Sequence, residues 1–183
     1  IKEHYIKRPV IFLAPHFWGL DIGANRFSIN FTSYSMMYDD SDSILRAKLK
    51  TARMRFMVDQ GGEVFSRQDG ISKIVKKLRR TKFAFYYLPD IDLGEANSLY
   101  VPFFAHASCA TLSSLAKITQ LTRAVIVPMV TFRESGRYVV KFYDAWENYP
   151  SLDESADVLR MNQFIEKMIL EHPEQYMWSL KRF

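Results

Sequence analysis

Cysteine is nearly absent from this sequence. One residue, Cys109, occurs among 183, so the chain cannot form an internal disulfide bond. No CxxC pair and no Cys/His group with zinc-ligand spacing is present, and we expect no bound metal. Cys109 lies in an apolar stretch, Ala107 to Leu112, where a free thiol usually packs as a small hydrophobic side chain. We therefore predict that Cys109 is a buried packing residue.

Long apolar runs and glycine-rich loops are also missing. No run approaches the ~20 residues that cross a bilayer as a helix, and no signal peptide is visible. Neither a Rossmann nor a Walker phosphate loop occurs, and there is no GxSxG elbow. These absences argue against a nucleotide cofactor and against serine-hydrolase chemistry, and we expect no cofactor.

The composition is that of one globular domain with an uneven charge. Hydrophobic residues make up 48% of the chain and charged residues 25%, so we predict a single domain over residues 1–183. The net charge is +5, yet the segment from Arg46 to Lys82 carries 12 basic and 3 acidic side chains, a net +9. Such a segment favours an acidic partner, which leaves nucleic acid, anionic lipid and acidic protein as alternatives.

Short apolar runs alternate with helical patterns along most of the chain. This alternation predicts an α/β fold with one central mixed, largely parallel sheet flanked by helices. We predict strands at 10–14, 31–38, 63–66, 83–88, 124–132, 138–146 and near 176–181, and helices at 17–27, 42–58, 69–80, 108–121 and 153–171.

Polar residues follow three of the predicted strands. In open α/β sheets, sites collect beyond the carboxyl ends of the strands, so these residues are candidates for a site. His16 follows the first strand, with Asp21 five residues later. A carboxylate on one ring nitrogen of a histidine lets the other take a proton from a hydroxyl. The alternative is a core histidine with an unrelated aspartate.

Three further residues follow the other two strands. Arg67 offers a planar donor for phosphate or carboxylate, or else forms a surface ion pair with Asp69. Asp90 and Asp92 lie on one side of an extended segment. They are candidates to bind a divalent metal, to orient Arg67 and His16, or simply to form a solvated turn. Near His16 and in the basic segment, the remaining candidates for substrate contacts are Phe17, Trp18, Arg53 and Arg55.

Several segments, in order, resemble the bacterial lipid A biosynthesis acyltransferases of the glycerolipid acyltransferase superfamily. His16 and Asp21 fit that superfamily's motif of His, four residues, then Asp or Glu. The stretches 62–67, 87–94, 101–104, 127–128 and 173–183 also look similar to the family. One departure is Ser66, which stands before Arg67 where the wider superfamily has an acid.

The resemblance implies a specific reaction and place. His16 and Asp21 would be the catalytic pair of an O-acyltransferase. The donor would be an acyl-carrier-protein thioester and the acceptor an anionic lipid A precursor. The reaction would take place at the membrane surface, on the cytoplasmic face of the inner membrane of a Gram-negative bacterium. The family usually has an N-terminal hydrophobic anchor, and we expect this sequence, which begins at Ile1, to be missing it.

Two other classes of function remain open from the residues alone. One is a metal-dependent glycosyltransferase that uses Asp90 and Asp92 as a DxD motif. The other is a nucleic-acid-binding module built on the basic segment. The second lacks a recognisable motif, and its aromatic residues lie in strand-like runs rather than among the lysines and arginines, so we expect no nucleic-acid partner.

Overall fold

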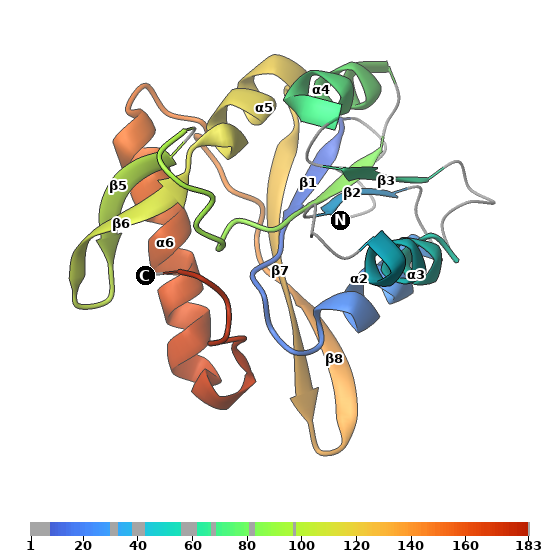
Figure 1. Cartoon of the computed structure of the whole chain (residues 1–183). Coiled ribbons are helices and arrows are strands. Elements are labelled where there is room, and N and C mark those ends of the chain that lie inside the picture. Colours follow the sequence, from blue (N-terminus) through green and yellow to red (C-terminus); the bar gives the residue numbers. More distant parts are fainter. Residues whose placement is uncertain are drawn as a thin grey trace.

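The computed structural model describes residues 8–29, 33–37, 43–55, 62–66, 69–80, 83–96 and 98–182. A six-stranded sheet in the order β3-β2-β4-β1-β7-β8 forms its centre, with a separate two-stranded sheet, β5-β6, to one side (Figure 1). The strands of the large sheet are β1 (Val10–Leu13), β2 (Ser33–Met37), β3 (Glu63–Ser66), β4 (Ala84–Tyr87), β7 (Val125–Glu134) and β8 (Arg137–Phe142). The small sheet pairs β5 (Ser98–Phe103) with β6 (His106–Leu112), and the helices are α2 (Leu20–Ser28), α3 (Ser43–Met54), α4 (Gly70–Arg80), α5 (Ser114–Thr122) and α6 (Glu154–Glu171).

All neighbouring strands of the large sheet are parallel except β7 and β8. β1 lies in the middle, with Leu13 beside Tyr87 of β4 and beside Pro128 of β7. Continuous apolar runs suit such a position, because both faces of the strand are covered. The predicted α/β class and the mixed, largely parallel sheet are confirmed.

Alternate residues of β1 enter two cores. Ile11 and Leu13 face the core that α4, α5 and α6 cover, whereas Val10 and Phe12 face the core shared with α2. The rings of Phe12 and Phe27, on α2, lie 4.4 Å apart in an edge-to-face contact. Since both faces of β1 are sealed, what remains open for chemistry is the edge of the sheet where the strands end.

Two predicted elements are wrong. The helix expected at 108–121 begins only at Ser114, because residues 106–112 form β6 and pair with β5 in an antiparallel hairpin. Phe104 provides the tight turn of that hairpin with a φ of +51°. The strand expected near 176–181 is reduced to a single bridge between Phe17 and Tyr176, which a short 3-10 helix, Pro173–Gln175, precedes. Both errors arise because long-range pairing, which local patterns do not record, decides these segments.

The other predicted elements are found with shifted ends. The helix predicted at 42–58 runs from Ser43 to Met54, and residues 56–58 lie outside the described residues. Cys109 is buried, as predicted. In the described part of the chain, no helix has both the length and the apolar character to cross a membrane.

Candidate active site

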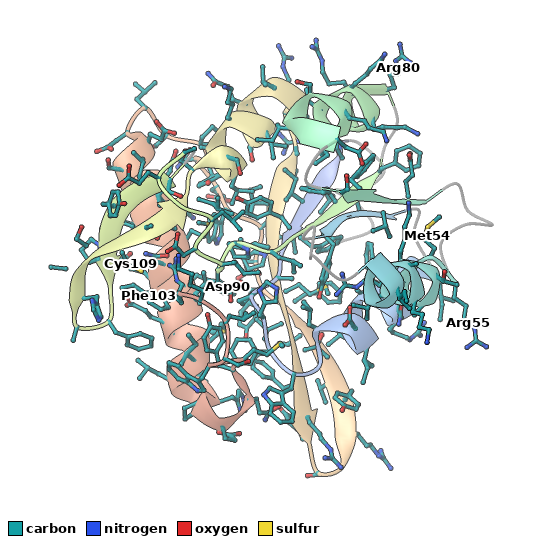
Figure 2. All side chains as sticks on the ribbon, viewed as in Figure 1. Met54, Arg55, Arg80, Asp90, Phe103 and Cys109 are labelled. Atoms are coloured by element: carbon teal, nitrogen blue, oxygen red, sulfur yellow. The ribbon has the colours of Figure 1, made fainter. Side chains whose placement is uncertain are left out.

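His16 and Asp90 meet at the carboxyl edge of the sheet. Each follows one of two adjacent strands, β1 and β4, so the two loops leave the sheet side by side. The His16 ring nitrogen Nδ1 lies 2.7 Å from Asp90 Oδ1, and the His16 backbone N–H donates to Asp90 Oδ2 at 2.8 Å. One carboxylate therefore fixes both the backbone and the ring of His16. Figure 2 labels Asp90 near the centre of the molecule.

The contact with Asp90 assigns the two ring nitrogens of His16. A carboxylate accepts a hydrogen bond, so Nδ1 carries the proton, and Nε2 of the neutral ring keeps its lone pair. Among the described residues nothing hydrogen-bonds Nε2. The imidazole is 8% exposed, which makes it more enclosed than an open rim of the sheet would predict. Nε2 is thus the atom suited to accept a proton from a hydroxyl.

Asp90 is fully buried and still favours its ionised form. Burial alone raises the pKa of this carboxyl, but the positive charge that the His16 ring carries when protonated, and the two hydrogen bonds from His16, bring it below its usual value. The hydroxyl of Tyr176 also lies close to Asp90, although it makes no well-formed hydrogen bond. Burial first, and then the charge of Asp90, raise the pKa of Tyr176. The centre therefore contains a charged carboxylate, a histidine and an un-ionised phenol.

Asp21 does not hold His16 in this structure. It lies in the first turn of α2, and its Oδ1 accepts a 2.9 Å hydrogen bond from Nε of Arg53 on α3. The expected contact between Asp21 and His16 is thus corrected: the carboxylate on Nδ1 is Asp90. The reason is positional, because β4 ends beside β1, whereas the Asp21 carboxylate is half exposed. A catalytic role for Asp21 stays a prediction.

The Asp21–Arg53 pair is nevertheless close to the centre. The buried Tyr86 hydroxyl lies near enough for Asp21, Arg53 and Asp90 all to influence it. Burial is the main cause that raises the pKa of Tyr86, followed by the negative charge of Asp21. Arg53 is tied to the first turn of α2, five residues after His16, through its hydrogen bond to Asp21.

Two glycines let α2 approach β7 beside the site. A Cβ placed on Gly23 would overlap Thr131 Oγ1, and one on Gly19 would lie 2.7 Å from Thr131 Cγ2. Any larger residue would push α2 away from β7. Because α2 begins four residues after His16, this close packing also sets the path of the loop that carries His16.

The segment 175–182 closes over the loop after β1, and the sequence reading missed this contact. Trp18 N–H donates to Gln175 O, and Met177 N–H donates to His16 O, both at 2.9 Å. Arg182 anchors the segment: its buried guanidinium donates to Asn162 Oδ1 at 2.6 Å. The aromatic residues of this stretch were the available signal, but nothing local indicates which loop they contact.

Phe17 and Trp18 have opposite environments. Phe17 is fully buried, and its ring packs edge-to-face on Phe132 at 5.3 Å, so it is a core residue. Trp18 is 75% exposed. Of the two residues considered for an acyl path, only Trp18 is accessible.

The contacts of Asp90 and Asp92 argue against a metal-binding DxD motif. Both Asp90 oxygens accept from His16. Asp92 Oδ1 accepts from the Gly94 N–H at 2.7 Å, and this bond, with help from Lys181, lowers the pKa of Asp92. Within the described ranges, no group of three or more His, Cys, Asp and Glu residues is placed to hold a metal ion. The two aspartates thus act separately, one on His16 and one in a turn.

The basic residues of the predicted positive segment lie in different parts of the molecule. Arg67 lies outside the described residues. Arg55, just beyond α3, is exposed and lies on the side of the molecule away from Asp90 (Figure 2). On α4, Lys73 and Lys77 pair with Glu63, whereas three other cations line an open groove of about 450 Å³ between α4 and α5. The groove residues are Ser72, Val75, Lys76, Arg79, Arg80 and Leu121.

That groove lies far from His16 along the strand direction. α4 leads into the start of β4 and α5 into the start of β7, so their last turns lie at the amino edge of the sheet. His16 and Asp90 lie at the carboxyl edge. In Figure 2, Arg80 is at the top of the view, whereas β7 ends at the bottom. The α4 cations are therefore not part of the His16 centre.

Comparison with known proteins gives one consistent result. The sequence model of the family described as "Bacterial lipid A biosynthesis acyltransferase" matches residues 2–183. The chain is 33% identical over 175 residues to the lipid A biosynthesis acyltransferase of Haemophilus influenzae, covering 94% of this chain and 52% of that protein. It is 31% identical over 175 residues to the lipid A biosynthesis myristoyltransferase of Escherichia coli, with the same coverage. With the lauroyltransferase of that bacterium it shares 30% identity over 180 residues, covering 97% of this chain and 56% of that protein. The chain thus spans about half the length of these relatives.

Proposed function

Because the chain belongs to the bacterial lipid A biosynthesis acyltransferase family, we propose that it transfers a fatty-acyl group from a thioester to a hydroxyl of a lipid A precursor. The observation that carries the proposal is the His16–Asp90 pair, with Nδ1 bound to a buried carboxylate and Nε2 without a hydrogen bond among the described residues. That arrangement is what a general base for a hydroxyl requires.

The reaction proceeds without a covalent enzyme intermediate. Nε2 of His16 takes the proton of the acceptor hydroxyl while its oxygen attacks the thioester carbonyl carbon. Asp90 stabilises the imidazolium that forms, because its charge lies 2.7 Å from Nδ1. The tetrahedral intermediate then breaks its C–S bond, and the proton on Nε2 passes to the departing sulfur. The products are an ester and a free thiol, and His16 returns to its neutral form.

The first turn of α2 supplies N–H groups that would stabilise the oxyanion of the tetrahedral intermediate. Its N-cap is Gly19, which has no side chain to cap the helix. The N–H groups of Asp21 and Ile22 find no backbone acceptor among the described residues. Unpaired donors of a helix's first turn favour negative charge, and each well-placed donor to an oxyanion is worth roughly 10²–10³ in rate. In this mechanism they hold the thioester oxygen, while Arg53 contacts the anionic acceptor.

The donor in this proposal is an acyl-carrier protein, and the site of action is the cytoplasmic face of the inner membrane. Carrier proteins are acidic, so exposed cations near the carboxyl edge of the sheet, such as Arg26 on α2, are the ones suited to guide a thioester to Nε2. The α4 cations lie at the other edge of the sheet. We expect charge reversal at Arg79 to leave donor KM within about twofold of the unaltered chain.

The test is the His16→Ala variant, assayed with an acyl-carrier-protein thioester and a purified lipid A precursor. Loss of general-base assistance should lower kcat by about 10²–10⁴. The matched control is His172→Ala, which removes a histidine that lies 4.0 Å from Glu134 and outside the His16 centre. If His16→Ala turns over at the rate of the His172 control, the proposed chemistry is wrong.

A further inference from the structure

Apolar side chains are exposed on the outer face of α2 and just before it. Trp18, Ile22 and Ile29 are 75%, 42% and 46% exposed. Ile22, Arg26 and the C-cap residue Ile29 follow each other at spacings of four and three residues, so they form one stripe along the helix, and Trp18 precedes the helix in the loop after β1. The opposite face, with Phe27 and Gly23, packs into the core. The outer face of α2 thus combines half-exposed isoleucines with charged side chains.

The charge of this stripe is positive. Arg26 is exposed and forms no ion pair among the described residues, while the charge of the neighbouring Asp21 is matched by Arg53. A surface that combines Trp and Ile with an unmatched cation fits an anionic lipid surface: the apolar side chains enter the headgroup boundary and the cation meets the phosphates. The acidic surface of a soluble protein would match the charge of the cation but would not bury the two isoleucines and the tryptophan.

A second exposed tryptophan lies on the same rim. Trp178 is 54% exposed, and its ring packs against Tyr176, which bridges Phe17 in the loop after β1. Its indole N–H donates to Pro173 O at 2.7 Å, so the ring is held in place. Indole rings are enriched where membrane meets water, because one part is apolar and the other polar.

We propose that the outer face of α2, with Trp18, Ile22, Arg26 and Ile29, and the adjacent Trp178 form the surface by which this domain lies on an anionic phospholipid bilayer. The proposal rests on the proposed function, since a lipid-borne hydroxyl must reach His16, two residues before Trp18. It adds the orientation: the carboxyl edge of the sheet faces the bilayer, and the groove between α4 and α5 faces away from it.

The tryptophans make the test direct, since the chain has three. Trp146 is the internal control: its backbone N–H donates to Ile126 O near the start of β7, at the amino edge, and its ring packs against the core. Three single-tryptophan variants, with Phe at the other two positions, are mixed with phosphatidylethanolamine–phosphatidylglycerol vesicles that carry brominated acyl chains. We expect bromine to quench Trp18 and Trp178 and to leave Trp146 unchanged.

Two substitutions separate the apolar and the charged contributions. Ile22→Ser should weaken binding to these vesicles by about tenfold, because it removes a large apolar side chain from the contact. Arg26→Gln should weaken it about fivefold on anionic vesicles and leave binding to neutral vesicles unchanged. Leu152→Ser, at a fully exposed leucine before α6, is the matched control and should change neither.

Activity distinguishes this proposal from the proposed function. Acyl transfer is measured with the acceptor in vesicles and again dispersed in detergent, and the ratio of the two rates should fall for Ile22→Ser and Arg26→Gln. Equal quenching of all three tryptophans would overturn the docking surface, and so would absent quenching with normal transfer in detergent. Burial of Trp18 by a soluble acidic carrier protein, without vesicle binding, would also overturn it. Quenching of Trp18 and Trp178 without any acyl transfer would support the surface and refute the reaction.

Discussion

The Asp90→Asn variant tests whether the carboxylate that serves His16 comes from β4. The amide has nearly the same shape as the carboxylate, but one of its two acceptor oxygens becomes an NH₂ donor. In the structure both oxygens accept, one from the ring Nδ1 and one from the backbone N–H of His16. The variant must therefore place a donor against a donor, or turn His16 into the tautomer with its proton on Nε2.

The size of each effect follows from this geometry. An unsatisfied buried donor costs about 1–3 kcal/mol, and a chain of this length loses ~2–4 °C of Tm per kcal/mol, so we expect Tm to fall by about 2–12 °C. The loss of kcat should be larger, about 10²–10⁴, because the same change in a Ser-His-Asp triad costs about 10⁴ through the wrong tautomer. Most of the molecules remain folded at 25 °C under these figures.

The assay is kcat, compared between Asp90→Asn and Asp21→Asn. Asp90→Asn should show the larger loss, because Asp90 is the carboxylate that contacts the ring of His16. Asp21→Asn should lose less, because the Asp21 carboxylate pairs with Arg53 and not with His16. A loss in Asp21→Asn that equals or exceeds the loss in Asp90→Asn would refute the assignment.

Three further predictions concern stability. Gly23→Ala should lower Tm by about 2–12 °C, because overpacking against Thr131 costs about 1–3 kcal/mol, and Thr131→Ala should restore part of the loss, as thermal unfolding of the single and double variants will show. Tyr176→Phe should leave Tm within about 2 °C, since the buried hydroxyl has no hydrogen-bond partner among the described residues. The ionised form of Asp90 stabilises the folded state above its ordinary pKa of 3.8, and this contribution is lost as the pH falls through the lowered pKa. The free energy of unfolding, measured with urea between pH 2 and 6, should therefore fall more steeply toward acid pH for the unaltered chain than for Asp90→Asn.

The sequence predicts the sheet well because buried parallel strands have a strong local signature. Val10–Leu13 and Ala84–Tyr87 are apolar throughout, and a proline follows each strand within two residues, Pro15 and Pro89, so their place in the middle of a sheet can be predicted from the local sequence. Segment 106–112 has no such signature. Its strand state depends on pairing with β5 and on the turn at Phe104.

The candidate site shows where local spacing stops being informative. His16 is identified by its place after a strand, but its partner is 74 residues away in sequence. The motif points to Asp21 because it lies near His16 in sequence. The order of the strands, however, decides which carboxylate reaches Nδ1 of His16. Asp90 was a candidate to orient His16, and only the adjacency of β1 and β4 selects it over Asp21.

The way residues 175–182 are tied down has a consequence for synthesis on the ribosome. In the loop of His16, the backbone N–H of Trp18 donates to Gln175 O and the oxygen of His16 accepts from the N–H of Met177, while the buried Arg182 holds that segment to Asn162. The central strands can pair as soon as they emerge, but the histidine loop obtains its final supports only from residues translated some 160 positions later. A nascent chain interrupted before this point would hold a formed sheet with an unsupported reaction centre, so premature termination would yield inert protein rather than an enzyme with altered selectivity.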